Sequence, residues 1–266
     1  MTNMNFENLI VKREGKVATI TLNRPEKLNA ITSKMLQEII RIITEVDKDD
    51  SISVLIITGA GRAFSAGLDL KDMAALSNLK DAEEVRVFHQ RNTKAISMSL
   101  QNMEKPTIAM VNGLAIAVSC DLALTCDIRT GSENARFAET QVNFGGVPGL
   151  GGTWVLPRLV GYGRAAEIIW TADFIDAEEA YRIGILNHLF PAAKLEEKTM
   201  ELAQRIASKP AIGLKLTKLN LRRGLEANLE TAISLVNMSQ GISATSSEHA
   251  RIITEKQQQI KKEKEA

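Results

Sequence analysis

Cysteine is scarce in this sequence, and the two cysteines present lie in one apolar stretch. Cys120 and Cys126 are too few for the disulfide framework of a small secreted domain or for a four-cysteine zinc site. Both are expected to be small core residues, and no metal site is predicted. Long apolar runs are absent as well. None approaches the roughly 18 residues needed to cross a bilayer, so we expect no membrane segment.

The first ten residues, MTNMNFENLI, also lack the features of a secretion signal. They contain no basic segment followed by an apolar run of about 7–15 residues. Together with the low cysteine content, this absence predicts a soluble protein of the cytoplasm.

An excess of charge of either sign is missing too, since 33 Lys and Arg residues stand against 32 Asp and Glu residues. The net charge of +1 gives no basic field for a phosphate backbone, which argues against nucleic acid as the main ligand. What the chain does have is length and apolar content, with 266 residues of which 44% are hydrophobic. A folded chain of this size buries roughly 70–75% of the surface exposed when it is unfolded, which excludes disorder as its main state.

The first half of the chain alternates strand and helix patterns. Residues 8–23 alternate in polarity and predict a hairpin. Apolar residues at helical spacing predict an amphipathic helix over 32–48, and the β-branched run 53–58 predicts a strand buried on both faces. A second such strand, 107–111, leads into a helix of small residues at about 117–125. This order predicts an α/β fold.

The other stretches are helical or rich in glycine. Residues 71–104 are charged with a helical pattern, which predicts a surface lid. Glycines around Pro148 within 136–161 predict a backbone that makes close approaches. A shift of composition near 195 predicts a β/α core followed by a helical appendage, with helices over 163–171, 176–183, 194–208, 211–223, 225–240 and 246–260.

Three familiar sequence motifs are present only in part, because each lacks one required residue. Gly59 and Gly61 begin a dinucleotide-binding fingerprint, but Phe64 stands where its third glycine belongs. The segment 146–153 lacks the lysine that a phosphate-binding P-loop requires. Ser65 lies in a near match to the nucleophile elbow of serine hydrolases, whose first glycine is missing. The sequence therefore argues against all three activities.

Two loops of small residues, 63–68 and 112–119, each follow a predicted strand. Loops at the carboxyl ends of adjacent strands can direct two backbone N–H groups at one oxygen, and the second loop leads into a helix N-terminus. This arrangement predicts an oxyanion hole. Alternatively, the small residues only allow a helix to pack closely on a strand, and the pattern by itself leaves both interpretations open.

A family resemblance is carried by the segments 20–30 (ITLNRPEKLNA), 62–71 (RAFSAGLDLK), 105–113 (KPTIAMVNG) and 136–153 (RFAETQVNFGGVPGLGGT). In this order, and over essentially the whole chain, the sequence resembles the enoyl-CoA hydratase/isomerase, or crotonase, superfamily. The resemblance implies the crotonase α/β fold, a ClpP-like spiral of β-β-α units. It implies a core with the CoA and active sites over 1–195, and a C-terminal helical region over 196–266 that assembles a homotrimer or homohexamer.

The resemblance also implies an acyl-CoA thioester as substrate, with no separate cofactor. In that family two main-chain N–H groups hold the thioester oxygen, and they fall here on Leu68 and Val118. One such donor lowers the barrier by roughly 3–4 kcal/mol in comparable sites. The residues expected to bind the rest of the substrate are Ala66 near the adenine, Arg24 and Lys71 near the phosphates, Gly67 and Gly149.

The chain differs from that family at the two positions whose side chains hold the reacting water. Hydratases of the family hold one water between two carboxylates, but this chain has Asp121 at the first position and Gln141 at the second. Gln141 can hydrogen-bond to a water but cannot exchange a proton at neutral pH. Val118 replaces a glycine of the family and is expected to reshape the acyl pocket.

Three accounts of the chemistry remain open. Asp121 could act alone, with its pKa raised from about 3.9 toward neutrality by burial. A second group could come from the lid, where the candidates are Glu84, His89 and Lys94. Glu139 could also supply this second group, although we expect it to contact the catalytic residues and not the substrate. The third account is isomerisation, decarboxylation or hydrolysis through the same enolate.

We expect a hydratase, a lyase acting on an enoyl- or dienoyl-CoA, cyclic acyl groups included. The reason is that Asp121 stands where a water-handling carboxylate belongs. A different class of function is a non-catalytic scaffold that binds CoA. An exposed Asp121, or a Val118 that blocks the two N–H groups, would favour the scaffold. An Asp121 that faces one water together with Gln141 would favour the enzyme.

Overall fold

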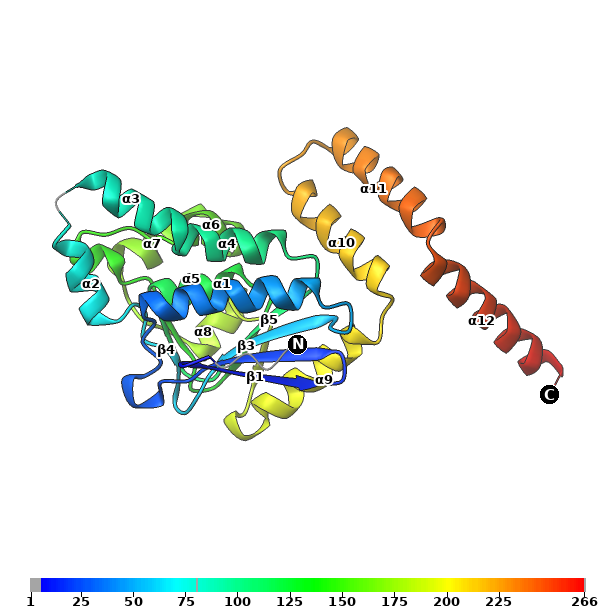
Figure 1. The fold of residues 1–266 in the computed structure, drawn as a ribbon, viewed down its shortest axis with the longest axis horizontal. Coiled ribbons are helices and arrows are strands. Elements are labelled where there is room, and N and C mark those ends of the chain that lie inside the picture. Colours follow the sequence, from blue (N-terminus) through cyan, green and yellow to red (C-terminus); the bar gives the residue numbers. More distant parts are fainter. Residues whose placement is uncertain (1–5, 80, 266) are drawn as a thin grey trace.

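The structure is a computed structural model that describes residues 6–79 and 81–265 (Figure 1). Residues 1–5, which form half of the segment predicted to lack a secretion signal, lie outside the described residues, as do residues 80 and 266. The described chain builds two β-sheets, helices that pack on them, and a helical arm that reaches away from the sheets (Figure 1).

The larger sheet contains the strands predicted in the first half of the chain. Its order is β1 (Leu9–Glu14), β2 (Val17–Leu22), β3 (Val54–Gly59), β5 (Thr107–Val111), β7 (Ile128–Ser132) and β10 (His188–Phe190). β1 and β2 form the predicted antiparallel hairpin, and the other strands continue the sheet in parallel. The carboxyl ends of β2, β3, β5, β7 and β10 therefore lie along one edge.

Helix α1 (Ser33–Lys48) confirms the helix predicted over 32–48. It begins where Thr32 Oγ1 accepts the N–H of Met35 at 3.2 Å, which satisfies one of the free donors of the first turn. Its apolar stripe is buried and consists of Met35, Leu36, Ile39, Ile42, Ile43 and Val46.

Strand β3 shows why its sequence is apolar without alternation. Leu55 packs into the same hydrophobic cluster as α1, whereas Val54 packs into a second cluster with helix α9 (Leu195–Ala207). Every residue of β3 is buried, as expected for a strand covered on both faces. Helix α9 thus forms one layer of the sheet, although it begins where the sequence places the end of the core.

A smaller sheet consists of β4 (Ala63–Ser65), β6 (Leu114–Ile116), β8 (Arg136–Ala138) and β9 (Ile175–Asp176). Its first three strands are parallel, and β9 runs antiparallel to β8. Consecutive strands of the pairs β3–β4, β5–β6 and β7–β8 enter different sheets. This alternation produces the predicted α/β spiral, so the fold class is confirmed.

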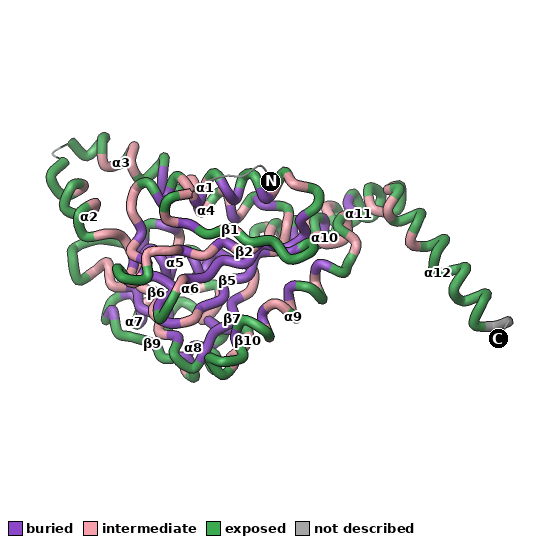
Figure 2. The backbone as a smooth tube through the Cα atoms, turned by 60° about the horizontal axis from the view of Figure 1, so that its bottom comes forward, coloured by how far each residue is buried: buried purple, intermediate pink, exposed green. Residues whose placement is uncertain are grey.

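The predicted lid over 71–104 consists of α2 (Leu70–Ser77), α3 (Ala82–Arg91) and α4 (Thr93–Asn102). The described parts of α2 and α3 contain no buried residue, and Figure 2 shows both at one end of the molecule. In contrast, α4 buries Thr93, Ile96 and Leu100. Only α2 and α3 are therefore exposed enough to form a lid.

The fold is completed by α5 (Val118–Thr125), α6 (Gly152–Val160), α7 (Tyr162–Thr171), α8 (Ala177–Arg182), α10 (Ala211–Gly224), α11 (Leu229–Ala244), α12 (Ser247–Glu265) and short 3-10 turns at Pro25–Lys27, Gln141–Phe144 and Ala192–Lys194. Lys218 and Arg222 attach α10 to the core, because they bind the Asp127 carboxylate at 2.8 and 2.6 Å. Helices α11 and α12 project beyond it (Figure 2). None of the described helices is long and apolar enough to cross a membrane.

Candidate active site

The two loops of small residues meet at the end of the smaller sheet. β4 and β6 run parallel with Ser65 opposite Ala115, so the chain leaves both strands on the same side. The loop after β4 contains the half-buried Ala66 and then Gly67, whose φ is 92°. A Cβ at Gly67 would stand 2.9 Å from the carbonyl oxygen of Ile116. Glycine at this position therefore lets the two loops touch.

Ser119 joins the start of α5 to the first loop. Its Oγ donates to the carbonyl oxygen of Ser65 at 2.7 Å and accepts the N–H of Ile116 at 2.9 Å. The N–H groups of Leu68 and Val118 donate to no acceptor in residues 6–79 and 81–265. Two free N–H donors thus lie on touching loops, one of them at a helix N-terminus where the potential is positive.

Ala117, the residue before α5, has φ of 53° and ψ of −120°, a conformation that residues with a Cβ rarely adopt. Such backbone strain costs about 1–3 kcal/mol. Ala117→Gly is therefore expected to raise the free energy of unfolding by about 1 kcal/mol, after allowance for the larger entropy of an unfolded chain with glycine. Denaturant unfolding of both proteins measures the difference, and a less stable glycine variant would contradict the prediction.

Asp121 is completely buried on α5. Its Oδ2 accepts the backbone N–H of Leu150 at 2.9 Å, and its Oδ1 lies against Gly152, where a Cβ would stand 2.0 Å away. Burial raises the pKa of Asp121 to about 6 from an ordinary value of 3.8, and the hydrogen bond from Leu150 limits the rise. The pKa thus moves in the direction that suits a proton-transferring carboxyl group at neutral pH.

Glu139 and Gln141 lie beside this carboxyl group. Gln141 Nε2 donates to Glu139 Oε2 at 3.0 Å, and Glu139 is 1% exposed. Burial and then the negative charge of Asp121 raise the pKa of Glu139 well above its ordinary value of 4.5. The structure thus brings Glu139 to both Asp121 and Gln141. The sequence signal for this position was its spacing of two residues from Gln141, which in an extended segment places both side chains on one face.

The raised pKa of Asp121 predicts how stability depends on pH. Between pH 3.8 and about 6 the folded protein holds a proton on Asp121 that the unfolded chain has released. The stability due to this group is therefore fully present below pH 3.8 and is lost as the pH rises through about 6. Relative to Asp121→Asn, the wild-type free energy of unfolding should fall by about 2–3 kcal/mol over this range. Denaturant unfolding of both proteins across it checks the prediction, which a constant difference would contradict.

The three candidates from the predicted lid segment, Glu84, His89 and Lys94, contribute less than Glu139 to this site. Glu84 and Lys94 are exposed, and none of the lid candidates is hydrogen-bonded to the buried carboxyl groups among the described contacts. His89 approaches the glycine-rich loop, since a Cβ at Gly149 would stand 3.9 Å from its Nδ1. Partial burial lowers the pKa of His89. The lid therefore adds a neighbour to the loop but no proton-transfer group to the described contacts of Asp121.

Arg24 is bound by the protein itself. Its Nη1 donates to Asp69 Oδ2 at 2.9 Å and to the carbonyl oxygen of Ala30 at 2.6 Å. The Arg24 guanidinium also lowers the pKa of Asp69. Arg24 thus supports the loop that carries Leu68, whereas the Lys71 side chain at the start of α2 is exposed.

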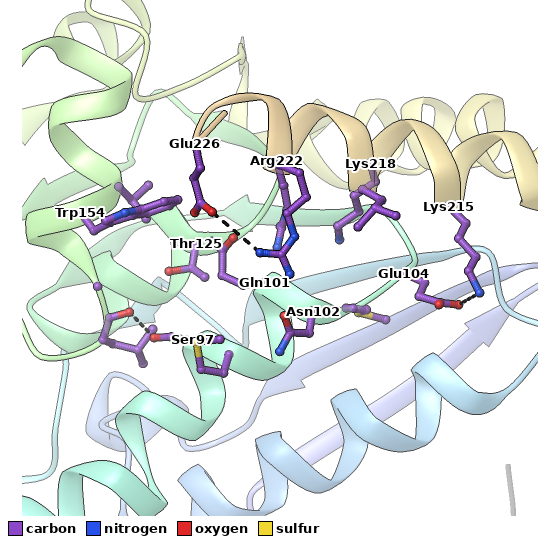
Figure 3. A pocket seen from close by; sticks show the side chains of 17 residues that line it. Ser97, Gln101, Asn102, Glu104, Thr125, Trp154, Lys215, Lys218, Arg222 and Glu226 are labelled. Atoms are coloured by element: carbon purple, nitrogen blue, oxygen red, sulfur yellow. Dashed lines mark hydrogen bonds and ion pairs between the residues drawn. The ribbon is translucent and has the colours of Figure 1, made fainter. Parts of the chain in front are cut away.

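A cavity of about 500 Å³ opens between α4, α6 and α10 (Figure 3). Leu150 forms part of its wall, but none of the predicted site residues lines it. Basic side chains of this cavity are already paired, because Lys215 binds Glu104 at 2.5 Å and Lys218 binds Asp127 at 2.8 Å. These ion pairs hold the lysines in place within the protein, and the predicted site residues lie elsewhere, so we place no part of the site there.

Known proteins match this chain over nearly its whole length. A sequence model of the family enoyl-CoA hydratase/isomerase matches residues 12–262. The short-chain-enoyl-CoA hydratase of Clostridium acetobutylicum is 40% identical over 232 residues, which is 87% of each chain. The crotonyl-CoA hydratase of Syntrophomonas wolfei is 40% identical over 233 residues, 87% of this chain and 88% of that one.

Solved structures agree with the sequence matches. The structure of a Thermobifida fusca YX protein of the enoyl-CoA hydratase type, in complex with acetoacetyl-CoA, matches with a TM-score of 0.81 at 31% identity. The match covers 88% of this chain and 93% of that chain. The chain therefore belongs to the enoyl-CoA hydratase/isomerase family, the crotonase superfamily, and is an enzyme of its hydratase-like type.

Proposed function

We propose that this enzyme adds water to the carbon–carbon double bond of an enoyl-CoA thioester. The observation that carries the proposal is the buried Asp121 on a helix whose first N–H, that of Val118, has no partner in the described chain. Free N–H donors beside a carboxyl group of near-neutral pKa can form and protonate a thioester enolate. The names of the two bacterial relatives favour a short acyl group.

The N–H groups of Leu68 and Val118 are proposed to hold the thioester carbonyl oxygen. Negative charge collects on that oxygen as the enolate forms, and the two donors then bind it more strongly than they bind the neutral carbonyl group. The dipole of α5 acts in the same direction at Val118. The side chains at these positions take no part in this contact, so valine supplies the same backbone donor as glycine.

Asp121 is proposed to move the proton. Its carboxylate removes a proton from water as the water oxygen bonds to Cβ of the substrate, and the electrons of the double bond shift to the thioester oxygen. Protonated Asp121 then gives this proton to Cα, which restores both the thioester and the carboxylate. One carboxyl group completes the cycle, so Gln141 need not exchange a proton.

The remainder of the CoA is proposed to lie along the first loop. Ala66 and Gly67 present backbone to the adenine, and the exposed Lys71 meets the phosphates. Arg24 acts indirectly, because its ion pair with Asp69 holds this loop. Gly149 in the glycine-rich loop is proposed to leave room for the acyl group.

A panel of acyl-CoA thioesters tests the reaction type. Linear, cyclic, dienoyl and β-carboxylated thioesters are each incubated with the enzyme in deuterated water and followed by mass spectrometry. We expect the mass of one water to be added to short enoyl-CoA. Deuterium exchange with movement of the double bond would indicate an isomerase, and loss of carbon dioxide a decarboxylase. Unchanged thioesters throughout would favour a scaffold that binds CoA.

We also propose that residues 196–266 assemble the chain into a homotrimer or homohexamer. Large apolar side chains of this region face solvent, with Leu225, Leu229 and Met238 exposed by 69%, 76% and 60%. Such a helix face is buried against a neighbour in a stable protein. Light scattering should give a mass of three or six chains, and a monomer in solution would contradict the assembly.

A further inference from the structure

Three oxygen atoms in the candidate site are buried and lack a hydrogen-bond partner among the described residues: Asp121 Oδ1, Glu139 Oε1 and Gln141 Oε1. A buried oxygen without a donor costs free energy, and a buried charge costs more. Two ionised carboxylates side by side would add mutual repulsion in a setting of low dielectric constant. These oxygens therefore need hydrogen-bond donors that the side chains, with both carboxyl groups ionised, do not supply.

One proton between the two carboxyl groups removes most of this conflict. We propose that Glu139 is a neutral carboxylic acid at working pH and that its O–H donates a hydrogen bond to the Asp121 carboxylate. Glu139 Oε2 can then act as the carbonyl oxygen that accepts the amide of Gln141. Glu139 is thus a positioning residue for Asp121, and the inference rests on the proposed hydratase function.

The surroundings decide which residue keeps the proton. Each carboxyl group accepts one neutral N–H donor, Asp121 from Leu150 and Glu139 from Gln141. Asp121 Oδ1 also lies against Gly152, the first residue of α6, where the positive potential of the helix N-terminus favours a negative charge. The pKa of Glu139 is raised well above its ordinary value, and that of Asp121 only to about 6. The titratable group that faces the pair from α5 is the Cys120 thiol, and burial raises its pKa, so it is neutral as well. The pair therefore carries one negative charge, located on Asp121.

The hydrogen bond from Gln141 to a neutral Glu139 explains why position 141 carries an amide and not a carboxylate. An amide can hold Glu139 by donating Nε2–H, whereas a carboxylate at position 141 would add a second negative charge beside Asp121. In the reaction, Asp121 takes the proton of water and returns it to Cα, and the proton of Glu139 stays where it is. Glu139 keeps Asp121 ionised at lower pH than burial alone would allow and fixes the direction of its carboxylate.

The acidic limb of the pH profile of kcat/KM tests the sign of this effect. In Glu139→Gln the new amide still donates to Asp121, so we expect a loss of about three- to tenfold and a limb at the same pH. In Glu139→Leu the donor is lost, so activity should fall by about ten- to a hundredfold. Its acidic limb should move up by about one pH unit. Circular dichroism and CoA binding of both variants control for folding.

Other results would overturn the proposal. If Glu139 is ionised, its removal takes away a negative charge, and the limb moves to lower pH in both variants. If Glu139 itself exchanges a proton with the substrate, Glu139→Gln should lose more than about a hundredfold. An unmoved limb in Glu139→Leu would also contradict the assigned role.

A measurement without substrate separates this inference from the proposed function. Infrared difference spectra of the enzyme with ¹³C-labelled glutamate carboxyl groups should show one protonated carboxylic acid at neutral pH. This band should vanish in Glu139→Gln, and its absence from the wild type would overturn the inference. If no thioester reacts while the band is present, the proposed function fails and the proton assignment stands.

Discussion

Replacing Asp121 with asparagine is expected to lower kcat by about 10²–10⁴-fold, the usual contribution of a general acid–base group. The asparagine amide can occupy the same space and still accept the N–H of Leu150, so the fold and the binding of CoA should persist. Steady-state kinetics on a short enoyl-CoA, with calorimetric titration of CoA, measure the two effects separately.

Asp173→Asn provides a matched control for this prediction. Asp173 is an exposed carboxylate on the connection after α7, so its variant should behave as the wild type in both measurements. Retained turnover in Asp121→Asn would remove Asp121 from the mechanism. A parallel loss of CoA affinity would assign the residue to folding of the site.

Gly152→Ala is expected to have an effect of similar size, through geometry. The added Cβ would stand 2.0 Å from Asp121 Oδ1, and both atoms belong to buried elements with little room to move. The carboxyl group must turn away from α6, which breaks its hydrogen bond to Leu150. We expect kcat to fall by more than about 10²-fold and the free energy of unfolding to fall by about 1–3 kcal/mol, as for an overpacked core.

Gly163→Ala is the matched control for this change. Gly163 also lies near the start of a helix, α7, but a Cβ there would meet no atom within 4 Å. Alanine is the better helix former, so this variant should keep its activity and gain about 0.5–1 kcal/mol of stability. Equal activity of the two alanine variants would show that the position of Asp121 does not depend on Gly152.

The sequence predicted elements that are long and strongly patterned. Helix α1 and strand β3 have an apolar period that one window can detect, and both are confirmed. The strands β4, β6 and β8 have three residues each, too few to show a period. Their parallel pairing brings together the loops 63–68 and 112–119, which are proposed to carry the two N–H donors. The sequence could predict this part of the site only from the small residues of the loops and from the family resemblance.

Of the two buried carboxyl groups, the sequence singled out Asp121 more clearly than Glu139. Asp121 stands out as a carboxylate in an apolar helix. The sequence left its burial open, although both its pKa and the choice between enzyme and scaffold depend on it. The signal for Glu139 is weaker. Its spacing of two residues from Gln141 places both side chains on one face if the segment is extended, but the same spacing is compatible with an exposed turn. Its burial depends on how β8 and α5 pack, which involves residues distant in the sequence. The ion pair between Arg24 and Asp69 also joins residues distant in the sequence, so the segment around Arg24 could not predict it.

The Ser119 hydroxyl group has a consequence for the timing of catalysis. Because it binds Ser65 and Ile116 within the folded chain, the two loops that carry the proposed N–H donors are held together by the protein itself and not by the arriving thioester. Little rearrangement of dipoles is then needed when the oxygen becomes charged. An inert enolate mimic should consequently associate in a single kinetic phase, without a slower closing step that involves these loops.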